Sequence, residues 1–323
     1  MRSLRTILAV CTLLLALPAS ASAAFTVGIS ENEPSMFSDP LFGEVGFKQA
    51  RVIASYDVAL HPGNFEYVRI ADYLAAANAA GVEPLVSFQH QRGDSSRCNQ
   101  KKYIGKGICK LPSQAAYEKA MKAFFAAFPS AKVISPWNEA NHFTQPTSRS
   151  PASAAKFTNT VAKLCKDCKI VVADILDQAD DPKAKNPKFT ETAKWISKFR
   201  KALKVKRGIC GIHNYSDVNR FRSTGTAAII KALGCKEYWL TETGGLYKFG
   251  SFWTKKTYKG CKSASSCQVK ATKYMFSLAK KNKKIKRLYV YTWFGAVTPR
   301  FDAGLVADGK PRSALAEIRK YVK

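Results

Sequence analysis

The sequence predicts an α/β protein, a (β/α)8 TIM barrel that forms a single domain. Short apolar runs recur along the 323 residues, and each is followed by a polar loop and then an amphipathic stretch. The runs are rich in Val, Ile, Leu and aromatic residues without strict alternation, which is typical of strands buried on both faces. Strands that alternate with helices throughout a chain of this length favour a closed barrel.

Eight strands and seven helices are expected. The strands cover Phe25–Ser30, Arg51–Tyr56, Glu83–Phe88, Ala131–Ser135, Lys169–Ala173, Gly208–His213, Glu237–Thr241 and Arg287–Thr292. The helices cover Ile70–Ala80, Gln114–Ala127, Ala152–Leu164, Thr190–Ala202, Thr224–Leu233, Ser265–Lys281 and Ser313–Val322. Gly81 and Gly234 follow two of these helices, where glycine commonly ends a helix. The first crossover, around Leu41–Lys48, is short and irregular. An open doubly wound sheet is the alternative, but no Gly-x-Gly-x-x-Gly follows an early strand.

The first 23 residues have the pattern of an export signal, and we expect residues 24–323 to form the barrel domain. Arg2 and Arg5 provide the positive start, Ile7–Leu17 the apolar middle, and Ala21-Ser-Ala23 a small-residue cleavage site. The apolar middle is too short to span a bilayer, and no other run approaches the necessary length. We therefore expect a secreted protein, extracellular or bound to a cell wall, without a membrane span.

The cysteines also indicate an exported protein. Removal of the signal removes one of the nine, and the remaining eight are neighbours in sequence: Cys98/Cys109, Cys165/Cys168, Cys210/Cys235 and Cys261/Cys267. Disulfides are expected in such a protein. The Cys-x-x-Cys pair could instead serve redox chemistry or zinc binding, but no second such pair accompanies it, which favours a structural bridge. Spacing does not fix the connectivity, so the pairing stays open.

The charge is strongly positive, with 52 Lys and Arg against 23 Asp and Glu. Many of the basic residues fall at predicted helix-to-strand junctions, which in a barrel lie on the face opposite the active site. A second set lies in strand-to-helix loops: Lys101, Lys102, Lys106, Lys110, Lys255, Lys256, Lys259 and Lys262. This set indicates solubility, adhesion to an anionic cell wall, or a preference for an acidic glycan. No nucleic-acid-binding module with interleaved aromatic residues is present, and we expect a monomer.

Polar residues and one large aromatic residue gather at the carboxyl ends of the predicted strands, where barrels of this class build their active sites. They are Arg51, His90, Asn138, Glu139, His213, Tyr215, Glu242 and Trp293. Glu139 and Glu242 follow strands four and seven as lone carboxylates. Two carboxylates at the ends of separate parallel strands are what cleavage of a glycosidic bond requires.

This pattern resembles clan A of the glycoside hydrolases, the retaining (β/α)8 barrels that include families 5, 39 and 128. In that clan an Asn-Glu pair ends strand four, as in Ser135-Pro-Trp-Asn-Glu-Ala-Asn141, although many members carry Pro where this chain has Ala140. A second Glu ends strand seven, as in Trp239-Leu-Thr-Glu-Thr-Gly-Gly245. An Arg on strand two, a His-x-Tyr after strand six and a Trp on strand eight also recur there. The resemblance runs from the second strand to the C-terminus and is specific for the clan only.

The resemblance implies a role for each carboxylate. Glu139 would be the general acid/base and Glu242 the nucleophile, with Arg51 and the Tyr215 hydroxyl as partners of the nucleophile. Asn138 would hydrogen-bond the sugar 2-hydroxyl. The substrate would be a carbohydrate, and the reaction needs neither a metal nor another cofactor.

The remaining candidates have structural alternatives. Trp293 would offer a ring face to a sugar, or else pack in the barrel. His90 and His213 would contact sugar hydroxyls, or else be buried core histidines. Trp253 lies in a long loop that could line an outer sugar site.

Two acidic clusters carry weaker expectations. Glu31 and Glu33 follow the first strand and could bind an outlying sugar, although solvation in a loop is the simpler interpretation. Asp174, Asp177, Asp180 and Asp181 follow strand five and suggest calcium, but their spacing is not that of an EF-hand loop.

We therefore expect a secreted retaining β-glycoside hydrolase. The alternatives are a glycan-binding barrel without turnover, a transglycosylase that uses the same carboxylates, and a wall-adhesion protein that acts through charge alone. The sequence leaves open the sugar, the linkage, and whether cleavage is internal or terminal.

Overall fold

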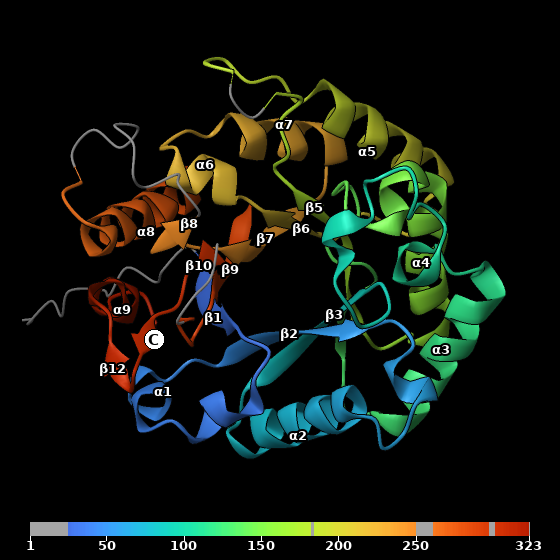
Figure 1. The fold of residues 1–323 in the computed structure, drawn as a ribbon, viewed down its shortest axis with the longest axis horizontal. Coiled ribbons are helices and arrows are strands. Elements are labelled where there is room, and N and C mark those ends of the chain that lie inside the picture. The colour runs from blue at the N-terminus through green and yellow to red at the C-terminus, as the bar shows by residue number, and fades with distance from the viewer. Residues whose placement is uncertain (1–24, 182–183, 250–260, 297–300, 323) are drawn as a thin grey trace, which may run out of the picture.

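The structure, a computed structural model, describes residues 25–181, 184–249, 261–296 and 301–322. The expected export signal and Trp253 lie outside these residues. Eight parallel strands close into a barrel in the order β1-β2-β3-β4-β5-β6-β7-β9 (Figure 1). They are β1 Thr26–Ser30, β2 Gln49–Ser55, β3 Glu83–Gln89, β4 Val133–Ser135, β5 Lys169–Leu176, β6 Ile209–His213, β7 Glu237–Thr243 and β9 Ile285–Tyr291. The predicted single-domain TIM barrel is thus confirmed.

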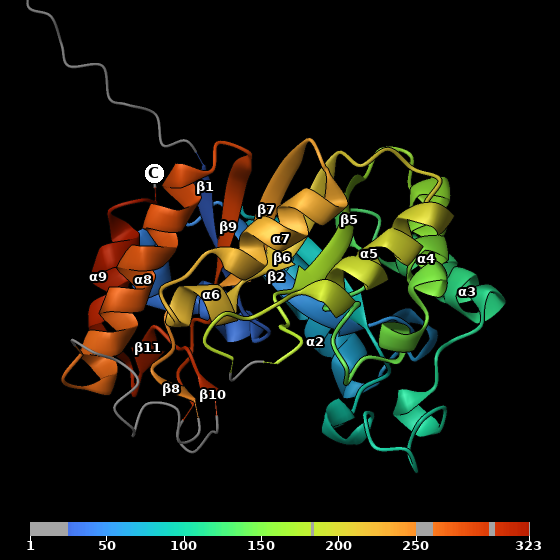
Figure 2. The same cartoon turned by 90° about the horizontal axis from the view of Figure 1, so that it is seen from above.

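Helices surround the ring on all sides (Figures 1 and 2). They are α1 Pro40–Val45, α2 Phe65–Ala79, α3 Gln114–Ala127, α4 Pro151–Leu164, α5 Thr190–Ala202, α6 Tyr215–Asn219, α7 Thr224–Leu233, α8 Ala264–Lys281 and α9 Ser313–Arg319. Short 3-10 turns occupy Pro34–Ser38, Val58–Leu60, Ser95–Arg97, Gly107–Cys109 and Pro146–Arg149. Two small antiparallel pairs join β8 Lys248–Phe249 to β10 Phe301–Asp302, and β11 Val306–Ala307 to β12 Lys310–Pro311.

Local chemistry explains where several helices begin and end. The short first crossover contains α1. At its start the Asp39 carboxylate accepts a hydrogen bond from Leu41 N, and Gly46, with φ of +76°, caps its end. Gly234 likewise ends α7 in the left-handed region, as predicted. The α2 helix begins earlier than expected, at Phe65. Its first turn contains Glu66, a buried residue that accepts a hydrogen bond from Ser55 N at 2.8 Å.

The barrel interior is built in layers. An apolar cluster of buried residues closes its lower part: Leu85, Val133, Val171, Trp239 and Tyr289. Two residues further along β3, β4 and β7, the side chains that turn inward are Ser87, Ser135 and Thr241, since alternate residues of a strand face the same side. A polar layer thus lies directly above the apolar one.

A β-bulge changes which residue of β5 enters this polar layer. Val171 pairs with Ile209, but the next pair is Asp174 with Gly211, so the register shifts by one residue between them. Strict alternation would have turned Ala173 inward, whereas Ala173 packs in the core outside the barrel. The extra residue therefore places the Asp174 carboxylate inside the ring.

All eight cysteines of the described residues form disulfides, and the pairs are Cys98–Cys109, Cys165–Cys168, Cys210–Cys235 and Cys261–Cys267. Their sequence separations are 11, 3, 25 and 6 residues. The Cys-x-x-Cys pair is a disulfide here, so its thiols are not free ligands for zinc.

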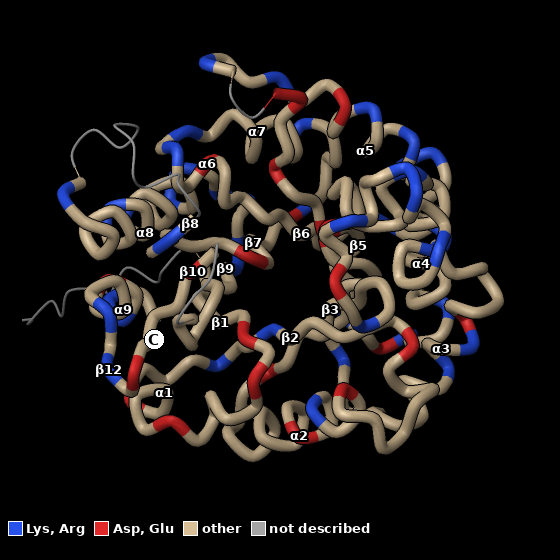
Figure 3. Tube along the Cα trace, viewed as in Figure 1, with Lys and Arg blue, Asp and Glu red and all other residues tan. Residues whose placement is uncertain are grey.

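Lysine and arginine are spread around the outer helices and loops (Figure 3). The polar interior instead combines Arg51 with acidic residues from other strands. Much of the positive charge thus lies away from the interior of the barrel. Within the described residues, no helix combines the length and the apolar character that crossing a bilayer requires.

The polar layer leaves no room for a side chain on β6 at position 211. A Cβ atom on Gly211 would overlap Asp174 Oδ1 and lie 2.7 Å from Thr241 Oγ1. We expect Gly211→Ala to lower the free energy of unfolding by about 2 kcal/mol through overpacking, as measured by urea denaturation. Gly208→Ala is the matched control, because a Cβ atom there meets nothing within 4 Å. Equal effects of the two substitutions would contradict the proposed packing.

Candidate active site

Glu139 and Glu242 are brought together at the carboxyl ends of the strands. Glu139 lies in the loop after β4, four residues beyond Ser135, and has φ of +44°, a left-handed conformation that is rare outside glycine. Hydrogen bonds from Ala140 N to Asp174 O and from His142 N to Glu139 O, at 3.0 and 2.7 Å, hold this turn. A carboxylate oxygen of Glu139, one of Glu242 and a ring nitrogen of His213 all lie within 4.8 Å of one another.

Glu242 enters the barrel because of a second irregularity. Gly211 pairs with Trp239, but His213 pairs with Glu242, so β7 shifts register before its end. Consecutive residues, Thr241 and Glu242, therefore both reach interior partners. The Glu242 side chain is only 9% exposed.

Arg51 on β2 is a fully buried cation that links the carboxylates. Its Nη1 donates to Glu242 Oε1 at 2.5 Å, and its Nη2 donates to Asn138 Oδ1 at 2.6 Å and to Asp174 Oδ2 at 3.3 Å. Burial lowers the pKa of Arg51, but the nearby Glu242 and Asp174 carboxylates outweigh burial and raise it. The predicted contact between Arg51 and Glu242 is present in the structure.

His213 lies between three carboxylates. Its Nε2 is 3.1 Å from Asp174 Oδ1, while its Nδ1 is 3.1 Å from Glu139 Oε1 and 3.6 Å from Glu242 Oε2. Burial lowers the pKa of His213, but Asp174, Glu242 and the hydrogen bonds to Asp174 and Glu139 outweigh burial and raise it to about 10. The ring is therefore an imidazolium at neutral pH. Both ring nitrogens face carboxylates, so His213 and the three acidic side chains form an ion-pair network.

Asp174 was singled out in the sequence only as a member of the acidic cluster that suggests calcium, and its place inside the barrel was not predicted. It is completely buried and accepts hydrogen bonds from Ser87 at 3.0 Å, Ser135 at 3.1 Å and Thr241, besides its contacts with the two cations. Burial raises its pKa, but His213 and Arg51 outweigh burial and hold the pKa well below its usual range. It is thus a permanent negative charge beside Arg51 and His213, which contact Glu242 and Glu139.

The surroundings of Glu139 favour its ionised form. Burial raises the pKa of Glu139, but the hydrogen bond and the charge of His213 outweigh burial and lower it. His142, which was not predicted, contributes in the same direction from 3.6 Å. The Glu139 side chain remains 19% exposed, which leaves it reachable from the mouth of the barrel.

Tyr215 lies where the sequence analysis placed it, and its hydroxyl donates to Glu242 Oε2 at 3.1 Å. Burial, followed by the Glu242 charge, raises the pKa of Tyr215, so the hydroxyl stays protonated and remains a donor. A further aromatic residue, Tyr291 at the end of β9, packs against Tyr215 with ring centroids 6.2 Å apart. Tyr291 has no motif around it that could have identified it.

For two predicted residues the structure shows the structural alternative that the sequence left open. The Trp293 ring is fully buried, donates to Asp39 Oδ2 at 2.9 Å, and meets the edges of Phe42 and Phe47. It packs the barrel against α1 and has no free face for a sugar, which corrects that expectation. His90 is buried, and its Nδ1 contacts Gln91 O at 2.5 Å; no contact with either reactive carboxylate is found within the described residues.

Members of both acidic clusters have structural partners. Glu31 is buried and accepts from Asn32 N, Thr292 Oγ1 and Phe294 N at 2.6, 2.6 and 3.0 Å, so it ties the loops after the first and last strands together. The acids after β5 bind helix N-termini: Asp177 accepts from Ser216 N and Asp217 N, and Asp180 accepts from Thr190 N and Glu191 N.

The comparisons with known proteins identify the fold. No protein-family model matches the sequence, and no curated protein matches it. Among solved structures, a psychrophilic glycoside hydrolase family 10 endo-beta-1,4-xylanase matches with a TM-score of 0.63 at 14% identity, over 91% of this chain and 96% of that one. Xylanase B from Clostridium stercorarium F9 matches with 0.61 at 14% identity, over 92% and 98%. A GH30 endoxylanase from Clostridium papyrosolvens C71 matches with 0.54 at 12% identity, over 93% and 72%.

At these identities the similarity concerns the fold. The chain has the (β/α)8 fold of clan A glycosidases along more than nine-tenths of its length. The structural resemblance to that clan, expected from the strand-end motifs, is confirmed.

The raised pKa of His213 makes stability depend on pH. The folded protein holds a proton up to about pH 10, whereas an unfolded histidine releases it near pH 6.5. The stability that His213 contributes is therefore complete below pH 6.5 and is lost as the pH rises towards 10. Urea denaturation between pH 6 and 9 should show a decline that is smaller in His213→Gln. An NMR titration of the His213 ring with a midpoint near 6.5 would contradict the assignment.

Proposed function

We propose that this protein is a secreted retaining β-glycoside hydrolase that acts on a polysaccharide or oligosaccharide by double displacement. The observation that carries the proposal is the approach of the Glu139 and Glu242 oxygens to within 4.8 Å, from the ends of two separate strands. Retaining glycosidases hold their carboxyl groups about 5–5.5 Å apart, whereas inverting enzymes need about 6.5–9.5 Å to admit a water molecule. The export pattern of the first 23 residues supports secretion.

In the first step, a Glu242 oxygen attacks the anomeric carbon while the glycosidic oxygen leaves with the proton of Glu139. Arg51 and Tyr215 donate to the two oxygens of Glu242, so they orient the attacking carboxylate and stabilise its charge before reaction. Arg51 also donates to Asn138 Oδ1. The amide NH2 of Asn138 is then the group that donates a hydrogen bond to a sugar hydroxyl.

In the second step, Glu139 removes a proton from water, and the resulting oxygen nucleophile attacks the anomeric carbon and releases Glu242. The charged side chains around Glu139 and Glu242 favour this second step. Formation of the ester removes the negative charge of Glu242, and the two cations Arg51 and His213 then balance the ionised Glu139 and Asp174. The base form of Glu139 is thus favoured at the stage that needs it.

The substrate class is supported by the fold and by the names of the similar structures. They include endo-xylanases and β-glucuronidases from an uncultured Clostridium and from Bacteroides uniformis. A screen of the purified protein against a panel of plant, fungal and bacterial polysaccharides would identify the sugar. Proton NMR of the first-formed product should show retained anomeric configuration; inversion would exclude the proposed mechanism.

Glu242→Ala should lower kcat on any substrate by at least about 10³-fold, because no glycosyl-enzyme can form. Azide should restore turnover of an activated aryl glycoside by entering the vacated space, and should yield a glycosyl azide of inverted configuration. Tyr247→Ala is a control in the following loop that leaves the carboxylates in place. Unchanged activity of Glu242→Ala would exclude it as the nucleophile.

Glu139→Ala should impair substrates with poor leaving groups far more than activated aryl glycosides, because only the former need the proton. Since His213 lowers the pKa of Glu139, its acid form is present only in acid, and kcat/KM for the natural glycan should fall as the pH rises from about 4 to 7. Glu139→Ala should lack this pH dependence on aryl glycosides. Equal losses on both substrate types would argue against the role.

A further inference from the structure

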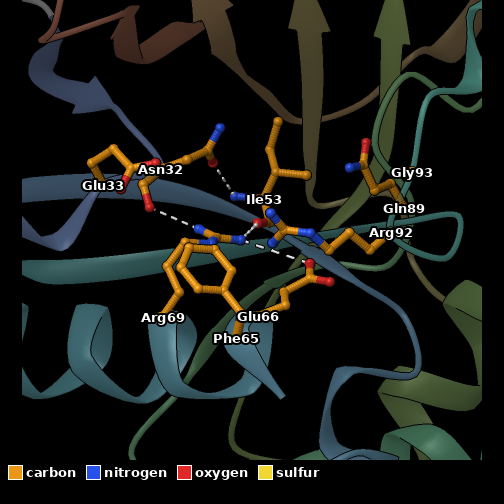
Figure 4. Close-up of a pocket in the computed structure, with 9 residues that line it drawn as sticks. All are labelled: Asn32, Glu33, Ile53, Phe65, Glu66, Arg69, Gln89, Arg92 and Gly93. Carbon is orange, nitrogen blue, oxygen red and sulfur yellow. Dashed lines mark hydrogen bonds and ion pairs between the residues drawn. The ribbon is translucent and has the colours of Figure 1, made fainter.

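A hollow of about 390 Å³ lies beside the candidate active site, at the ends of β1, β2 and β3. Its walls come from the loop after β1, from Ile53 on β2, from the first turns of α2, and from Gln89 and the residues after it (Figure 4). Ile53 is two residues beyond Arg51 on the same strand, so the hollow lies one step further towards the mouth of the barrel. Small-molecule sites commonly have volumes of about 300–1,000 Å³.

A set of hydrogen bonds holds the floor of this hollow rigid. Arg69 of α2 donates to Asn32 O at 2.7 Å and to Ile53 O at 3.0 Å, and Asn32 Oδ1 accepts from Ile53 N at 2.9 Å (Figure 4). Glu66 accepts from Ser55 N and lies 3.7 Å from Arg69. These bonds connect β2, the loop after β1 and α2, so the hollow is formed before any ligand binds.

The rim presents an aromatic ring and several polar side chains. Phe65 is 66% exposed although it is a large apolar residue, and the Arg92 guanidinium lies 4.7 Å from its ring centroid. The amide of Gln89 and the carboxylate of Glu33 line the same hollow. An exposed aromatic face surrounded by side-chain donors and acceptors suits a sugar ring, which has apolar C–H faces and hydroxyl edges.

The charges of the lining residues balance. Glu66 is paired with Arg69, and Glu33 and Arg92 contribute one charge of each sign. The positive charge of the whole chain therefore does not extend into this hollow.

We propose that this hollow is a subsite for an uncharged sugar unit of the glycan, next to the unit that Glu242 attacks. Phe65 is its stacking platform, and Arg92, Gln89 and Glu33 bind its hydroxyl groups. The assignment rests on the proposed function, which fixes the position of the cleaved sugar unit. It adds that the substrate is a neutral glycan with at least two units bound here, the unit that Glu242 attacks and its neighbour in the hollow.

The test compares substrates of different length. With neutral xylo- or cello-oligosaccharides, whichever the enzyme cleaves, Phe65→Ala should lower kcat/KM for the longer members by roughly tenfold, which corresponds to one lost aromatic contact. The same variant should leave the matching aryl monoglycoside unaffected, because that substrate fills only the position of cleavage. Arg92→Ala should follow the same pattern. Val68→Ala is the matched control, since Val68 is exposed on the same helix but does not line the hollow.

Binding measurements separate this proposal from the proposed function. Calorimetric titration of the same oligosaccharides into Glu242→Ala, with and without Phe65→Ala, needs no turnover. Weaker binding on loss of Phe65 supports the subsite even where the wild type hydrolyses nothing. Equal losses on short and long substrates, or unchanged binding, would overturn it. Tighter binding of uronic-acid oligosaccharides that Arg92→Ala abolishes would overturn the assignment to a neutral sugar.

Discussion

The buried carboxylate of Asp174 is the constraint on which the site depends. It contacts both cations of the barrel interior, Arg51 at 3.3 Å and His213 at 3.1 Å. Each cation in turn contacts one of the reactive carboxylates, Glu242 or Glu139. A cation buried without such a partner would lose its charge or leave the interior. The fixed negative charge of Asp174 therefore determines where the positive charges lie, and these determine the orientation of the reactive groups.

The barrel and the two carboxylates could be predicted because they depend on local and repeated signals. Buried parallel strands have a recognisable composition, and Asn138-Glu139 and Thr241-Glu242-Thr243 each mark the end of a strand. Which side chains turn inward could not be predicted. Strict alternation places Ala173 inside, and only the bulge in β5 replaces it by Asp174. The sequence carries no local sign of that bulge, which becomes visible only in the pairing of β5 with β6.

The residues whose surroundings the sequence left open have a common origin. Trp293 and Glu31 do lie at strand ends, as predicted, but a side chain at a strand end can face the mouth of the barrel or the surrounding loops. Trp293 turns to α1 because its ring nitrogen donates a hydrogen bond to Asp39 there and its ring packs against two phenylalanine rings. Glu31 turns to the loop after β9 because two donors, Thr292 Oγ1 and Phe294 N, lie there. Only the tertiary contacts decide between these directions.

The placement of the disulfides has a consequence for the ring as a whole. The largest sequence separation between the bridged cysteines is 25 residues. Each of these disulfides therefore closes a local loop, and none of them links the first strand to the last. That seam includes the backbone pairing of Thr26–Ser30 with Arg287–Tyr291, the hydrogen bonds that Glu31 accepts from the loop after β9, and the packing of Phe25 on Phe276 and Tyr321. An engineered covalent link across it would enclose almost the entire chain. By loop-closure entropy, it would restrict the unfolded state more than any of the native bridges does.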